Sequence, residues 1–185
     1  MLKNREDFMK LREEVKKSYE LQTEKIIVCA GTGCVAGGSL KIYDRLKELC
    51  DERGIKVAVE LEVDPHDESI GLKKSGCHGF CEMGPLLRID PQGWLYTKVK
   101  VEDCEEIIEK TVLKGEPIDR LACKKDGVSY QKQDEIPFYK QQTRIVLEHC
   151  GKIDAESIRE YIAIGGYSAF EKALFDMTAD DIVSE

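Results

Sequence analysis

Near the start of the chain, apolar residues recur every three or four positions, with charged residues between them. The repeat consists of Phe8, Leu11, Val15 and Tyr19. This spacing predicts an amphipathic helix over residues 5–22. The next segment, KIIVCA at 25–30, is apolar and β-branched, so it predicts a buried strand.

A second helix is predicted after a glycine-rich segment. Ser39 is a suitable N-terminal cap for a helix that extends from Leu40 to about Arg53. The predicted apolar face of this helix consists of Leu40, Tyr43, Leu46 and Cys50. Apolar and charged residues then alternate over 56–63, which predicts a strand with one solvated face. Residues 64–76 are expected to form a polar connection.

The following segment predicts a hairpin and a helix. PLLRID at 85–90 and WLYTKVKV at 94–101 predict two strands that Gly93 separates. Residues 101–115 have the spacing of a helix. The order of elements is then αβαβ followed by ββα, so residues 1–115 are predicted to form a small α/β domain.

The remainder of the chain differs in pattern. Residues 116–136 have weak periodicity and many charges, so we expect a linker. Residues 137–185 are predicted to be helical. One helix is expected to end before Gly151, one to begin at a capping Asp154, and one to follow Gly165 and Gly166.

Composition and charge narrow the class of protein. The 185 residues carry a net charge of −8, and no cluster of Lys and Arg is available for phosphate groups. We therefore expect no nucleic-acid partner. The longest apolar run, 26–30, is far shorter than the roughly 20 residues of a membrane-spanning helix. The charged N-terminus lacks the apolar core of a signal peptide. A cytoplasmic protein without a membrane span is expected.

Four of the eight cysteines form two close pairs. Cys29 and Cys34 are separated by four residues, and Cys77 and Cys81 by three. Both pairs lie in glycine-rich segments, where the backbone can approach a metal cluster and direct N–H groups at its sulfurs. In a reducing compartment, paired cysteines favour metal or redox chemistry over disulfides.

Other interpretations fit these four cysteines less well. Structural zinc also binds four thiolates, although it favours shorter ligand spacings. A thioredoxin-type dithiol would show C-x-x-C, which is absent. Inert buried cysteines are a poor fit to glycine-rich loops.

The other candidate residues have simpler interpretations. Cys50 and Cys104 lie on apolar helix faces and are predicted to be core residues. Cys123 and Cys150 have no partner at ligand spacing and are predicted to be structural or incidental. His78 is adjacent to Cys77 and is a candidate to hydrogen-bond a cluster or ligate it. No residue is predicted to act as a general acid, general base or nucleophile.

The motifs CAGTGC at 29–34 and CHGFCEMGP at 77–85 resemble the thioredoxin-like [2Fe–2S] ferredoxin domain over about residues 24–115. That domain occurs in the small flavoprotein-partner subunit of respiratory complex I. It also occurs at the N-terminus of the β (flavin) subunit of NAD(P)-linked [FeFe] hydrogenases. The resemblance implies a thioredoxin-like α/β fold and a [2Fe–2S] cluster held by Cys29, Cys34, Cys77 and Cys81.

Residues 137–185 resemble the lead-in of the complex I NADH-binding subunit and of its hydrogenase and formate dehydrogenase relatives. This implies an electron-transfer module in an NAD(P)H-linked oxidoreductase, such as a bifurcating hydrogenase. Its partners would be a catalytic subunit and a small [2Fe–2S] subunit. The alternatives are a stand-alone ferredoxin, or the flavin subunit of a formate dehydrogenase or complex I relative.

The end of the chain adds one expectation. Thr178 and Asp181 have the spacing of a helix cap, but only four residues follow Asp181. A helix is marginal until roughly 12–15 residues have formed, so the native chain is expected to continue past Glu185. By resemblance, FMN, NAD(H) and a [4Fe–4S] cluster would be bound in that downstream part.

Overall fold

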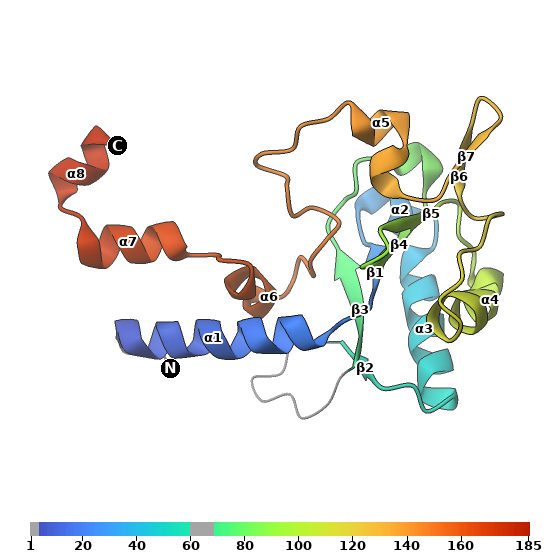
Figure 1. Ribbon diagram of the computed structural model, residues 1–185, viewed down its shortest axis with the longest axis horizontal. Coiled ribbons are helices and arrows are strands. Elements are labelled where there is room, and N and C mark those ends of the chain that lie inside the picture. Colours follow the sequence, from blue (N-terminus) through green and yellow to red (C-terminus); the bar gives the residue numbers. More distant parts are fainter. Residues whose placement is uncertain (1–3, 60–68) are drawn as a thin grey trace. The chain divides into compact units, whose positions relative to one another are not determined.

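The computed structural model describes residues 4–59 and 69–185, which form two compact units (Figure 1). The helical unit comprises residues 4–21 and 157–185, and the sheet unit comprises residues 22–59 and 69–156. No helix in the described ranges has the length and apolar character that crossing a bilayer requires.

A five-stranded sheet forms the centre of the sheet unit. Its strands lie in the order β2 (Val57–Ala58), β3 (Ile70–Ser75), β1 (Lys25–Cys29), β4 (Leu87–Asp90) and β5 (Trp94–Tyr96). β1 is parallel to β3 and antiparallel to β4. Ile26, Ile27 and Val28 are all buried, as expected for a strand that is covered on both faces. The predicted first strand and the hairpin across Gly93 are confirmed. The second strand of the hairpin ends at Tyr96, however, and not at residue 101 as predicted.

The register between β1 and β3 positions two loops. Cys29, the last residue of β1, lies opposite Ser75, the last residue of β3. Because the two strands are parallel, the segments that follow them begin at the same edge of the sheet. Cys29 itself and these two segments carry the two predicted cysteine pairs.

The polar connection predicted over residues 64–76 is wrong in its described part. Residues 64–68 lie outside the described residues, but Ile70–Ser75 form β3 between β2 and β1. Lysines concealed this strand in the sequence pattern. Lys73 is only 1% exposed, and its Nζ donates a hydrogen bond to the carbonyl of Val59 at 3.3 Å. A lysine inside the sheet is tolerated because its ammonium group finds an acceptor there.

The strand predicted at residues 56–63 is described only over its first part. Val57–Ala58 form β2 and pair in parallel with β3. Residues 60–63 of the prediction lie outside the described residues.

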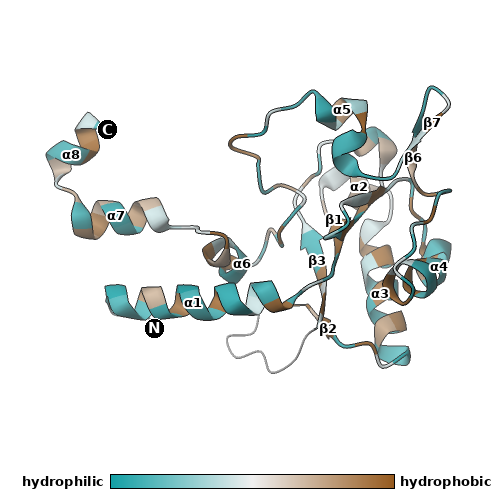
Figure 2. Cartoon of the chain, in the orientation of Figure 1, coloured by the Kyte–Doolittle hydropathy of each residue, from teal (hydrophilic) through white to brown (hydrophobic). Residues whose placement is uncertain are grey.

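Two helices follow β1, α2 (Thr32–Ala36) and α3 (Ser39–Glu52). Apolar and polar residues alternate along α3 (Figure 2), and its buried apolar residues are Ile42, Tyr43, Leu46, Leu49 and Cys50. The predicted helix is confirmed, but its predicted cap is wrong. Gly38, with φ of 95°, is the N-cap, while Ser39 is the first helical residue and is fully buried. Glycine adopts this left-handed conformation without steric cost. Leu40, predicted to face the core, is 40% exposed.

The helix predicted over residues 101–115 is confirmed for Val101–Val112. It consists of η2 (Val101–Asp103, 3-10), α4 (Cys104–Glu106) and η3 (Ile107–Val112, π). Cys104, Ile107 and Ile108 are fully buried in the core that α3 and the sheet share.

Residues 116–136 differ from the expected linker, because they are a folded part of the sheet unit. They contain the hairpin of β6 (Cys123–Lys125) and β7 (Val128–Tyr130) and the 3-10 helix η4 (Gln133–Glu135). Ile118 and Leu121 are buried in the main core, and Ala122 forms an isolated bridge with Tyr96. Few apolar residues anchor this segment, so its sequence shows no clear periodicity.

The prediction of a helix that ends before Gly151 is correct only for its first turn. Only α5 (Pro137–Lys140) is helical, and turns follow it. Ile145, Val146 and Leu147 are adjacent in sequence and are 81%, 93% and 59% exposed. They therefore form no buried face that would stabilise a helix.

The helical unit contains α1 (Arg5–Leu21), α6 (Ile158–Ala163), α7 (Ser168–Asp176) and α8 (Ala179–Ser184). The predicted N-terminal helix is confirmed as α1. Val15 of α1 is fully buried against Ile162 and Ala163 of α6. Arg5 and Arg12 of α1 form ion pairs with Glu171 of α7 at 2.9 and 2.6 Å.

The caps of the last helices show one wrong and one correct prediction. Asp154 does not cap α6; Ser157 does, and its Oγ accepts a hydrogen bond from the N–H of Glu160 at 3.2 Å. The predicted cap of α8 is confirmed, since the side chains of Thr178 and Asp181 each accept a hydrogen bond from the other's backbone N–H.

Candidate metal centre

The four predicted ligand cysteines come from three elements and one loop, which meet at one edge of the sheet. Cys29 ends β1, Cys34 lies in α2, Cys77 follows β3, and Cys81 begins the 3-10 helix η1 (Cys81–Met83). The Sγ atoms of Cys77 and Cys81 are 3.6 Å apart. The thiol of Cys29 interacts with those of Cys34 and Cys77. The fold thus brings together residues that are far apart in sequence.

Glycines permit this close approach. A Cβ atom at Gly31 would lie 2.8 Å from Cβ and 3.1 Å from Sγ of Cys77. One at Gly84 would lie 2.8 Å from Sγ of Cys34. Carbon atoms do not approach other heavy atoms so closely without displacement. A side chain larger than hydrogen at Gly31 would therefore displace Cys77, and one at Gly84 would displace Cys34.

The two pairs differ in exposure. Cys29 and Cys34 are each 1% exposed, whereas Cys77 and Cys81 are exposed at the surface. A group held by all four sulfurs would have one side in the protein interior and the other near solvent.

Backbone N–H groups point at the sulfurs. Gly79 donates to Sγ of Cys77 at 3.3 Å. The N–H groups of His78 and Gly31 interact with the Cys29 sulfur, and that of Leu86 with the Cys34 sulfur. Donors of this kind stabilise negative charge on thiolates, and they raise the reduction potential of iron–sulfur clusters.

The pKa values of the buried pair move in opposite directions. The hydrogen bond from Cys34 and, less strongly, the backbone N–H groups of His78 and Gly31 lower the pKa of Cys29 to about 6. The same contact with Cys29, together with burial, raises the pKa of Cys34. The contact between the two sulfurs thus favours the thiolate form of Cys29, and the thiolate is the form that ligates metal.

The sulfurs suit a binuclear cluster. The four sulfurs form two pairs, Cys29 with Cys34 and Cys77 with Cys81, and Cys29 also interacts with Cys77 of the other pair. Two irons that each take two thiolates would use such an arrangement.

Of the remaining four cysteines, two lie in the main core and two lie near the candidate ligands. Cys50 and Cys104 are fully buried, as predicted, and burial raises their pKa values to about 11 and about 12. Cys123 is buried in a small core that also contains Cys29 and Cys34. Cys150 lies in a pocket of about 380 Å³ beside Cys77.

Sequence reasoning missed the residues that surround the Cys77–Cys81 loop. The ring of Phe138 stacks on that of Phe80 at 4.6 Å, and Tyr139 and Arg144 donate to the backbone carbonyl of His78. These residues lie in a segment that was expected to be only a helical lead-in. No local signal marked them, because their contacts span about sixty residues of sequence.

The imidazole of His78 is itself not directed at the sulfurs. It is fully buried, and its Nε2 is 2.8 Å from Oγ of Ser75. Its backbone N–H, rather than its ring, faces Cys29.

Comparisons with known proteins point to one family. The sequence profile of the thioredoxin-like [2Fe-2S] ferredoxins matches residues 17–112. A 2Fe-2S ferredoxin of Aquifex aeolicus is 45% identical over 93 residues, which are 50% of this chain and 74% of that protein. One of Clostridium pasteurianum is 28% identical over 88 residues, 48% of this chain and 76% of that protein.

A solved structure of a thioredoxin-like [2Fe-2S] ferredoxin from Aquifex aeolicus aligns with a TM-score of 0.44 and 26% identity, over 58% of this chain and 96% of that one. The family profile alone spans just over half of the 185 residues. The chain therefore belongs to the thioredoxin-like [2Fe–2S] ferredoxin family, and it is an iron–sulfur electron carrier.

Proposed function

We propose that Cys29, Cys34, Cys77 and Cys81 hold one [2Fe–2S] cluster, and that the chain transfers single electrons within a cytoplasmic, NAD(P)H-linked oxidoreductase complex. One observation carries the assignment of the cluster ligands. The four sulfurs lie in pairs, and Gly31 and Gly84 lie so close to Cys77 and Cys34 that a side chain at either glycine would collide with the cysteine. When bound, such a cluster accepts and releases one electron at a time.

The two cysteine pairs would have different roles, one shielding the cluster from water and the other leaving it accessible to a redox partner. Cys29 and Cys34 would bind from the buried side, where apolar neighbours such as Leu86 and Leu95 exclude water. Cys77 and Cys81 would bind from the exposed side, so a redox partner could approach over them. The N–H groups of Gly79 and His78 would stabilise the charge on the sulfurs.

Two observations support a role inside a larger complex. Residues 113–185 lie outside the region that the ferredoxin profile matches, yet much of this part is folded. Helix α7 also exposes Phe170, Leu174 and Phe175 by 61%, 59% and 53%, and apolar patches of this kind are typical of interaction surfaces. Under this proposal the complex is a hydrogenase, bifurcating or not, and this chain is part of its β subunit.

Other groups of that complex would lie outside these 185 residues. FMN, NAD(H) and a [4Fe–4S] cluster belong, in this proposal, to another part of the β subunit. The hydrogenase catalytic subunit and a small [2Fe–2S] subunit would be the partners.

A stand-alone ferredoxin is the second candidate. The relatives from Aquifex aeolicus and Clostridium pasteurianum are both ferredoxins by name. The two candidates differ in the species that contains the chain in its native cell extract. The first requires that the chain copurify with a hydrogenase catalytic subunit, and the second requires that it migrate as a small free protein.

The cluster itself is tested by anaerobic purification. We expect about two irons and two inorganic sulfides per chain, and an electron paramagnetic resonance signal after one-electron reduction. One zinc per chain without sulfide would disprove the proposed cofactor.

A further inference from the structure

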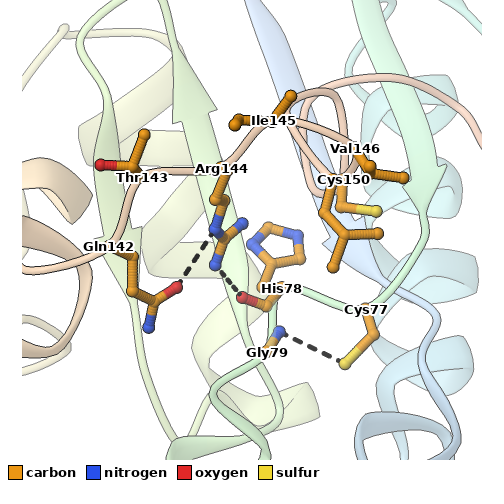
Figure 3. A pocket seen from close by; sticks show the side chains of 10 residues that line it. Cys77, His78, Gly79, Gln142, Thr143, Arg144, Ile145, Val146 and Cys150 are labelled. Carbon is orange, nitrogen blue, oxygen red and sulfur yellow. Dashed lines mark hydrogen bonds between the residues drawn. The ribbon is translucent and has the colours of Figure 1, made fainter.

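The backbone carbonyl of His78, within the Cys77–Cys81 loop, accepts two hydrogen bonds from a distant part of the chain. Nη2 of Arg144 donates to it at 2.8 Å, and Oη of Tyr139 at 3.2 Å. Figure 3 shows the guanidinium of Arg144 between this carbonyl and the side chain of Gln142, whose Oε1 accepts from Nε at 3.3 Å. The loop is therefore held by residues outside the segment that the ferredoxin profile matches.

The same distant segment contacts the loop at two further points. The rings of Phe138 and Phe80 are stacked, with an interplanar angle of 10°. The backbone at Gly151 lies against the His78 imidazole so closely that a Cβ there would be 3.0 Å from the ring. Together these contacts hold the loop between its two cysteines at His78 and at Phe80.

Arg144 also places a positive charge beside the loop. None of the ion pairs in the described part of the chain includes it, and its guanidinium is half-buried above the ring of Tyr139 at 5.1 Å. The charge thus remains available to act on a neighbouring group. Partial burial limits its screening by solvent.

We infer that Arg144 is a positioning residue for the [2Fe–2S] cluster. Arg144 holds the Cys77–Cys81 loop through the His78 carbonyl, and its positive charge raises the reduction potential of the cluster. This inference rests on the proposed function. Reduction adds one electron to the cluster and therefore one negative charge, and a fixed cation nearby stabilises the reduced state more than the oxidised state. The hydrogen bond to the carbonyl keeps the loop, and with it the cluster, in place beside that cation.

The test compares variants of the full chain in which the cluster has first been verified by iron and sulfide content. Arg144→Gln removes the charge, Arg144→Lys keeps it, and Tyr139→Phe removes only the second donor to the carbonyl. Arg53→Gln is the matched control, because it removes an equal charge at the C-terminal end of α3, where Arg53 pairs with Glu109.

The readout is a redox titration followed by electron paramagnetic resonance. At the wild-type midpoint potential, the ratio of reduced to oxidised cluster should fall about three- to tenfold in Arg144→Gln, where tenfold corresponds to about 59 mV for one electron. Arg144→Lys, Tyr139→Phe and Arg53→Gln should remain within about twofold of wild type. If Arg144→Gln loses the cluster while Arg144→Lys retains it, the positioning role is supported directly.

Two results would overturn the inference. One is an intact cluster with an unchanged potential in Arg144→Gln. The other is an equal shift, or an equal loss of cluster, in Arg144→Gln and Arg144→Lys, which would show that shape at this position matters and charge does not. A wild-type chain without iron and sulfide would instead refute the proposed function, so the two failures are distinguishable.

Discussion

Gly31 lies so close to Cys77 that a Cβ atom on Gly31 would be 2.8 Å from Cβ of Cys77. The two residues belong to the segments after β1 and β3, and the parallel register of these strands brings them together. The site therefore requires glycine at position 31 for a steric reason. The φ angle of Gly31 is −64°, which any residue adopts.

The first prediction follows from this contact. Gly31→Ala should reduce iron and sulfide per chain by at least about half, because the added methyl group displaces Cys77 at a cost of about 1–3 kcal/mol. Gly76→Ala is the control, since a Cβ there would meet only the side chain of Ala155, at 3.8 Å. Full iron content in Gly31→Ala would contradict the proposed arrangement of the loops.

A second prediction separates ligands from core cysteines. Changing Cys29, Cys34, Cys77 or Cys81 singly to Ala should abolish or cripple cluster assembly, as measured by visible absorption. Changing the fully buried Cys104 to Ala should leave the spectrum intact and lower the free energy of unfolding by about 1–2 kcal/mol. Loss of the cluster in Cys104→Ala together with its retention in Cys81→Ala would show that the assignment is wrong.

The third prediction concerns alkaline pH. Burial, as the largest cause, raises the pKa of Cys50 to about 11 and that of Cys104 to about 12, from an ordinary value of 9.0. Between pH 9 and pH 11, the unfolded chain releases thiol protons that the folded chain retains. The stabilisation by neutral thiols is therefore complete below pH 9 and is lost as pH rises toward the folded-state pKa values.

Urea denaturation at pH 8 and pH 11 measures this effect. We expect the wild type to lose several kcal/mol more stability than the double variant Cys50→Ala/Cys104→Ala, because each pKa unit corresponds to about 1.4 kcal/mol. Lysine and tyrosine titrate in the same range but are common to both proteins, so the difference isolates the thiols. Equal losses in the two proteins would count against buried, protonated thiols.

The fourth prediction concerns enzyme activity. Residues 1–185 with an intact cluster should neither bind FMN nor reduce an artificial dye with NADH, because the proposal assigns flavin and nicotinamide to other segments. A stopped-flow reduction by dithionite serves as the positive control for a redox-competent cluster. NADH-dependent dye reduction by this chain alone would require a nucleotide site within it.

Several features followed from short stretches of sequence. The strand at β1, the hairpin of β4 and β5, the amphipathic pattern of α3 and the cap of α8 all depend on residues within a few positions of one another. Periodicity and capping act over such distances, so these elements were predictable. The cysteine pairs and their glycines belong to the same group, since each pair spans only a few residues.

Other features required the folded chain. β3 was missed because Lys73 is buried by an interaction with Val59, fourteen positions away. The contact between Arg144 and the carbonyl of His78 spans 66 positions, and no periodic pattern extends that far. Local sequence therefore determined which residues are available to hold a cluster. Contacts of residues 116–156 within the sheet unit decided how the loop that carries Cys77 and Cys81 is held. Such long-range contacts form only once the sheet has brought distant segments together.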